Sequence, residues 1–164
     1  MLRFLSPLLQ VVFAGLLLLP LNTLAQPHST DDDDEAVHED YVPENVKNSF
    51  NDLYPTALGA EWEREGRYYE VDFEVDGELL EAKFRKDGQW MQTSQEIRRA
   101  PKPVYEAFSG SEYADSRIHE VEHVKSAGIT EFYVLEVDHN DRELELQYLP
   151  NGELIKTQLD DANE

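Results

Sequence analysis

Apolar and polar residues alternate through three consecutive segments in the first half of the chain. Residues 69–75 place Tyr, Val and Phe at every second position between acidic residues, which is typical of a β-strand with one buried side. The alternation returns in residues 80–85, and a shorter strand is expected at residues 90–93. Asp76-Gly77 and Asp87-Gly88 separate the segments, and such pairs favour tight turns. The pattern therefore predicts three antiparallel strands.

The second half repeats this arrangement. Strands are predicted at residues 132–137, 144–148 and 154–157, with turns at residues 138–141 and at Pro150-Asn151-Gly152. A short amphipathic helix precedes each set of strands, and a further strand is possible directly after each helix. The helices are predicted from proline at a first helical position and apolar residues at helical spacing; these positions are Pro43, Val46, Phe50, Leu53 and Tyr54, then Pro103, Val104 and Phe108.

Both halves thus predict the same order of elements, which indicates a duplication of residues 41–98 in residues 99–160. In an alignment of the two halves, Val75-Asp76 matches Val137-Asp138, Leu80-Glu81 matches Leu144-Glu145, Gly88 matches Gly152 and Thr93 matches Thr157. The alternative is two unrelated halves that share only a general pattern. The predicted fold is α+β, with two tandem helix-plus-antiparallel-sheet repeats whose helices pack on one face of the sheet.

The first 40 residues differ from the rest. Residues 1–25 combine Arg3, an apolar run and small residues before Ala25, which predicts a signal peptide. A membrane anchor is the alternative, although Pro20 interrupts the run and it is short for a bilayer. Residues 26–40 contain few apolar side chains and a block of acidic ones, so an acidic disordered leader is expected. The protein is therefore expected in the periplasm or outside the cell.

The net charge of −21 limits the possible partners. Such acidity opposes binding to nucleic acid or to an anionic membrane, because both carry phosphates. A protein with a basic surface, or a cation, remains as a partner. The chain has no cysteine, which excludes thiol catalysis and disulfides, so the exported fold must rest on a packed core.

His119-Glu120-Val121-Glu122-His123 matches the H-E-x-x-H pattern of zinc proteases, in which two histidines one helical turn apart bind the metal. Here the segment follows a helix, where an extended strand is expected. Residues four apart on a strand are separated by roughly 13 Å, too far to share an ion through bonds of about 2 Å. We therefore predict neither a metal site nor a cofactor, and a zinc-dependent hydrolase built on His119, Glu120 and His123 is kept only as an alternative.

A resemblance to a known family rests on the two hairpin segments, which read YYEVDFEVDGELLEAKFRKDGQW and YVLEVDHNDRELELQYLPNGELI. With the signal peptide and the two tandem units, they resemble the PepSY-like proteins, exported bacterial domains described as beta-lactamase-inhibitor-like. The resemblance spans residues 42–159 and carries over no catalytic residue. It implies helices on one face of a sheet whose other face grips a protein, and hence a binding or inhibitory module that restrains an envelope or secreted enzyme.

The alternation indicates which side chains would form that other face. It predicts a mostly acidic surface with a basic stripe, which could steer a cationic partner. No catalytic residue is predicted, and an acidic cation-binding protein is a further alternative. The predicted partner-binding residues are Tyr68, Glu70, Asp72, Glu74, Lys83, Arg85, Glu143 and Glu145.

Overall fold

The computed structural model describes residues 35–36 and 38–159. The predicted signal peptide and residues 26–34 of the predicted leader lie outside the described residues. Among the helices of the described part, none has the length and apolar character needed to cross a bilayer.

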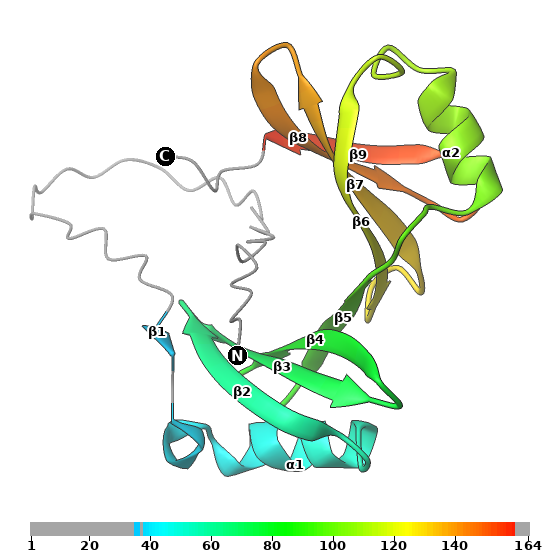
Figure 1. Cartoon of the computed structure of the whole chain (residues 1–164). Helices are drawn as coiled ribbons and strands as arrows, with labels where there is room; N and C mark the ends of the chain where they lie inside the picture. Colours follow the sequence, from blue (N-terminus) through cyan, green and yellow to red (C-terminus); the bar gives the residue numbers. More distant parts are fainter. Residues whose placement is uncertain (1–34, 37, 160–164) are drawn as a thin grey trace, which may run out of the picture.

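The described strands form one antiparallel sheet of nine strands in chain order, accompanied by two α-helices (Figure 1). This confirms the predicted α+β class with an antiparallel sheet, and the two possible strands after the helices are present as β2 (Leu58–Glu65) and β6 (Arg117–Ser126). The elements are β1 (Glu35–Ala36), the 3-10 helix η1 (Glu39–Tyr41), α1 (Glu44–Leu53), β2 (Leu58–Glu65), β3 (Tyr68–Val75), β4 (Glu78–Arg85), β5 (Trp90–Glu96), α2 (Lys102–Ser109), β6 (Arg117–Ser126), β7 (Phe132–His139), β8 (Arg142–Tyr148) and β9 (Leu154–Leu159).

Ordered structure begins before residue 41, inside the segment predicted to be a disordered leader. β1 pairs with β2, with Glu35 opposite Arg64 and Ala36 opposite Glu63. Backbone pairing of this kind does not need apolar side chains, which is why composition alone did not reveal it.

α1 lies against strands β2 to β4 because its apolar residues share one side. Val46 and Phe50 are buried, whereas Leu53, predicted on the same side, is 50% exposed. The ring of Phe50 meets Trp62 edge-on at 5.3 Å and Phe73 at 5.0 Å between centroids. Truncating such a buried ring typically costs about 3–5 kcal/mol, so Phe50 is the anchor of α1. The first core consists of Val42, Val46, Phe50, Trp62, Tyr69, Val71, Phe73, Ala82 and Phe84.

α2 packs on strands of the second half in the same manner. Val104 and Phe108 occupy the helical positions of Val46 and Phe50, and both are buried. The second core consists of Val104, Phe108, Val121, Tyr133, Leu135, Val137, Leu146 and Tyr148. Each half therefore has its own helix and its own core.

The β3–β4 and β7–β8 hairpins each close on a two-residue turn with left-handed backbone. Strand pairing leaves Asp76-Gly77 and Asn140-Asp141 as the turn residues, all with positive φ. Asp76 therefore corresponds to Asn140, and the alignment of Val75-Asp76 with Val137-Asp138 is two residues out of register. A single shift of 64 positions, from residue 76 to residue 140, relates β3–β5 to β7–β9. The duplication itself stays a prediction, which these turns support.

Two glycines bring the next turns against the helices. Gly88 has a φ of 85°, and a Cβ there would lie 2.7 Å from the carbonyl oxygen of Asn45 in α1. Gly152 has a φ of 89°, and its Cβ would lie 2.6 Å from the carbonyl oxygen of Pro103 in α2. Only a residue without a side chain fits this conformation and this distance. The equivalent contact in both halves fixes each helix on its strands.

We predict that Gly88→Ala and Gly152→Ala each lower the free energy of unfolding by about 2–3 kcal/mol, since both backbone strain and a clash with the helix are introduced. Gly77→Ala is the matched control, because its φ is also 85° but nothing lies within 4 Å of the added Cβ. Urea unfolding measures the difference. Equal destabilisation at Gly77 and Gly88 would show that the helix contact contributes nothing.

Candidate functional site

The two histidines of the H-E-x-x-H segment lie on strand β6, as predicted, and their side chains have different neighbours. The His119 Nε2 atom is 2.6 Å from Oδ2 of Asp138, whereas the His123 ring stacks on Tyr133 at 5.0 Å and its Nε2 is 3.3 Å from Glu131. Tyr133 belongs to the second core, while Asp138 follows buried Val137 and so faces away from that core. The imidazoles therefore lie on opposite sides of the strand and cannot share an ion.

In each half, we call the side of the sheet opposite that half's core the second face, and its residues alternate with the core residues along each strand. Cross-strand pairs on this face include Glu70 with Lys83, Asp72 with Glu81, Glu120 with Glu136, Glu136 with Glu145, and Asp138 with Glu143. All eight predicted partner-binding residues belong to the alternating set that forms this face, and Tyr68 pairs directly with Arg85. Tyr68, at the start of β3, is half-buried.

Burial divides the predicted partner-binding residues into two groups. Glu70, Lys83 and Glu145 are only 5%, 6% and 1% exposed, so they cannot offer the open acidic surface expected from the sequence. Glu143 is half-buried. Asp72, Glu74 and Arg85 are exposed and available to a partner. The accessible part of this set is therefore limited mainly to Asp72, Glu74 and Arg85.

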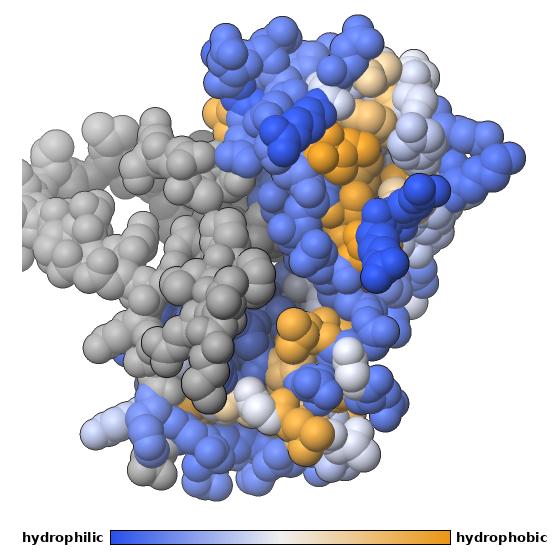
Figure 2. Space-filling view, in the orientation of Figure 1, coloured by the Kyte–Doolittle hydropathy of each residue, from blue (hydrophilic) through white to orange (hydrophobic). Residues whose placement is uncertain are grey.

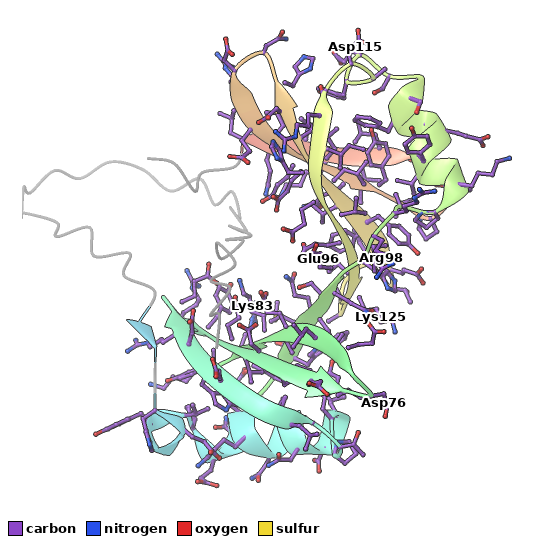
Figure 3. The ribbon with its side chains drawn as sticks, in the orientation of Figure 1. Asp76, Lys83, Glu96, Arg98, Asp115 and Lys125 are labelled. Atoms are coloured by element: carbon purple, nitrogen blue, oxygen red, sulfur yellow. The ribbon has the colours of Figure 1, made fainter. Side chains whose placement is uncertain are left out.

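Lys83 forms the ionic centre of the first half. Its Nζ is 2.9 Å from Oε2 of Glu70 and also contacts Oε2 of Glu65. Figure 3 shows Lys83 on the side of the lower strands away from α1. Burial alone would lower the pKa of Lys83, but Glu70 and Glu65 raise it above its ordinary value. Lys83 is therefore a permanent cation that offsets the two carboxylates.

Two glutamates near the middle of the second face hold protons at neutral pH. Burial raises the pKa of Glu81 to about 9, with the neighbouring charges of Glu70 and Glu122 acting in the same direction. Burial also raises the pKa of Glu122 to about 8, with further contributions from nearby carboxylates and an opposing hydrogen bond from Ser94. These side chains are poised to ionise when a cationic group approaches.

The second face also carries buried apolar residues, which were not predicted there. Val124, Phe132 and Val134 form a third buried cluster. The sequence signal was present, because residues 132–135 are apolar without alternation, which is typical of a strand buried on both faces. The acidic face thus has an apolar centre between β6 and β7.

A second missed feature is an exposed apolar pair on the first half. Leu58 and Leu79 are 66% and 75% exposed, and both pair with Glu74, on opposite sides of β3. The two leucines therefore flank an exposed carboxylate on the second face. Figure 2 shows hydrophobic patches in both halves of the molecule, bordered by hydrophilic residues. Exposed apolar side chains contribute favourable free energy when a partner removes them from water.

We predict that Glu122→Gln makes the fold more stable at pH 8 and not at pH 4. In the folded state Glu122 keeps its proton up to pH 8, whereas its ordinary pKa is 4.5. Between these values the folded state binds more protons than the unfolded one, so stability declines as pH rises. Removing the titration should gain on the order of 4 kcal/mol at pH 8, because each unit of pKa difference corresponds to about 1.4 kcal/mol.

Urea unfolding at the two pH values measures this gain. Glu74→Gln is the matched control, because Glu74 is exposed on the same face. An equal gain at pH 4 and pH 8 would contradict the assignment of a protonated Glu122.

Comparison with known proteins places this geometry among related folds. A family model described as "Putative beta-lactamase-inhibitor-like, PepSY-like" matches residues 28–80 and 67–156. No curated protein matches the chain.

Solved structures share the fold over most of their length. A DUF2874 family protein from Bacteroides ovatus is 30% identical, with a TM-score of 0.66, covering 71% of this chain and 86% of that one. A structure from Bacteroides eggerthii, described under "putative periplasmic proteins", is 25% identical, with a TM-score of 0.64 and coverage of 73% and 89%. A BLIP-like protein from Bacteroides fragilis is 24% identical, with a TM-score of 0.66 and coverage of 74% and 89%.

Proposed function

We propose an exported, non-enzymatic binding role for this chain, which belongs to the PepSY-like family of beta-lactamase-inhibitor-like proteins. In this role the second face of the sheet contacts a protein partner and restrains it, as an inhibitor restrains an enzyme. The partner is an envelope or secreted protein with a basic surface. Solved relatives described as BLIP-like and as periplasmic support this role by analogy of fold.

The role requires that both helices lie on the same face of the sheet, so that the other face is left for a partner. The strand register supports this. Ala82 of the first core pairs with Thr93, and Thr93 pairs with Lys125. Directly paired residues share a face, and so do residues two apart along a strand. Lys125 lies four residues from Val121 of the second core, and this register supports the placement of both cores on one face.

The observation that carries the proposal is the placement of Leu58 and Leu79 beside Glu74. Asp72 is also exposed on this face, one register step from Glu74 toward the strand centre. Apolar groups contribute affinity when they are removed from water, and acidic groups attract a cationic partner and orient it. A basic side chain flanked by apolar ones matches this site in charge and character.

Capture from the envelope fraction of the source organism, with the exported chain as bait, tests the role. Leu58→Ser/Leu79→Ser should weaken retention of the captured protein at least about tenfold, because each buried leucine contributes about 1.5–3 kcal/mol. Leu53→Ser is the matched control, since Leu53 is 50% exposed but lies on α1. If the captured protein is an enzyme, added chain should lower its activity. Equal loss in both variants, or none in either, would refute the assigned site.

Charge should govern the rate of this association. We expect Asp72→Lys/Glu74→Lys to slow association with the captured partner by roughly tenfold at low salt, and added salt to reduce the difference, because steering by exposed charges is screened. Surface plasmon resonance at two salt concentrations measures both effects. An association rate independent of salt and of these substitutions would contradict electrostatic steering.

A further inference from the structure

Three side chains from three adjacent strands converge at the end of the second half. His119 on β6, Asp138 on β7 and Glu143 on β8 each offer one ligand atom, and these atoms all lie within 4.8 Å of one another. Within the group, His119 Nε2 lies 2.6 Å from Asp138 Oδ2. Among the described residues this is the one group of histidine and carboxylate side chains with such geometry. It does not include His123, so it is unrelated to the H-E-x-x-H spacing.

A β-bulge brings His119 to the carboxylates. Ile118 pairs with Val137 and Glu120 pairs with Glu136, so His119 is the extra residue on β6. In a regular strand, His119 would point to the same side as Val121, into the second core. The extra residue re-aims the side chain, as bulges commonly do. The imidazole consequently reaches Asp138, whose direct partner on β8 is Glu143.

The first half provides an internal comparison. It has an irregularity at the same place, because Leu58 pairs with Glu74 and Glu61 with Asp72. The shift of 64 positions makes Asp72 equivalent to Glu136, so Glu61 corresponds to Glu120 and the preceding residue, Ala60, corresponds to His119.

By the same shift, Asp138 and Glu143 correspond to Glu74 and Leu79. The first half therefore combines one carboxylate with alanine and leucine and cannot chelate. The bulge belongs to the fold, whereas the imidazole and the second carboxylate are particular to the second half.

We propose that His119, Asp138 and Glu143 bind a divalent transition-metal ion of the zinc type. Imidazole nitrogen and carboxylate oxygen are ligands that Zn²⁺ accepts, and three protein ligands leave a fourth position for water or for a side chain of a partner. The two carboxylates compensate the charge of the ion. Glu120 and Glu136 follow in the next cross-strand pair and make the surroundings more attractive to a cation. The ion joins β6, β7 and β8 at the edge of the second face.

Calorimetric titration of zinc sulfate into the exported chain, after dialysis against a chelator, tests the site. One ion per chain is expected, with affinity lowered at least about tenfold in His119→Ala and in Glu143→Gln. His123→Ala is the matched control and should bind as the parent does. A second control is His28→Ala/His38→Ala, because the acidic leader also holds histidines. Unchanged binding in His119→Ala, or loss of the ion in either control, would overturn the proposal.

A structural readout keeps the test valid if a variant folds poorly. In the parent chain, zinc should shift the imidazole NMR signals of His119 and leave those of His123 in place, and it should raise the melting temperature. His119→Asn, which retains a polar side chain at the bulge, should fold without gaining stability from zinc. Shifts confined to His123 or to the leader histidines would refute the site.

Discussion

The pairing of β5 with β6 is the interaction on which the rest of the structure depends. These strands join the two halves through register pairs that run from Gln92–Ser126 to Glu96–Glu122. The ladder continues to Ile97, whose N–H donates to the carbonyl of Val121 at 2.8 Å. Because side chains alternate between the faces of a strand, this register decides which residues of the second half share a face with those of the first. A slip of one residue would move Val121 out of its core.

Once the two halves share a sheet, the same scaffold carries different chemistry in each. The ion pair of Glu70 with Lys83 occupies the positions that Val134 and Gln147 hold in the second half. A buried charge without its partner is strongly destabilising, so Lys83 and Glu70 constrain each other. The second half replaces this pair with an apolar centre. The exposed residues also differ between the halves. The first half carries the exposed Leu58 and Leu79, whereas the second carries the proposed metal ligands His119, Asp138 and Glu143.

This division explains how a short, acidic chain without cysteine can present a defined surface. Each half packs a helix through a glycine contact and a small aromatic or aliphatic core, and the common ladder holds the two second-face segments in one register. The glutamates in the middle stay protonated instead of repelling one another. A preformed surface of this kind suits a binding module, because little order has to be created when a partner arrives.

Periodicity in the sequence was sufficient for the helices, the strands and most of both cores. Val46, Phe50, Val104 and Phe108 are buried as their helical spacing predicts, and alternation located β3, β4 and β8. These features are local, so one segment at a time contains enough information. The strand at His119 to His123 was also predicted correctly, from its position after a helix.

Features that depend on pairing between strands could not be obtained in this way. The bulge that turns His119 toward Asp138 exists only relative to β7, and a period of two places both histidines on one side. Alternation along β8 predicts that Glu145 is exposed to solvent, yet the residue is only 1% exposed. The turn predicted at residues 138–141 contains Asn140-Asp141, but Asp138 was aligned with Asp76, whereas hairpin register makes Asn140 the equivalent of Asp76. Exposure of Leu58 and Leu79 likewise follows from tertiary placement.

The join between the two halves is tested most directly by nuclear Overhauser measurements across β5 and β6. In an antiparallel ladder where Ile97 and Val121 form a hydrogen-bonded pair, Ser94 and Val124 form a non-hydrogen-bonded pair with close Cα atoms. We predict a strong contact between the Hα atoms of Ser94 and Val124. Its absence, together with independent tumbling of the two halves, would contradict a shared sheet and with it the single second face.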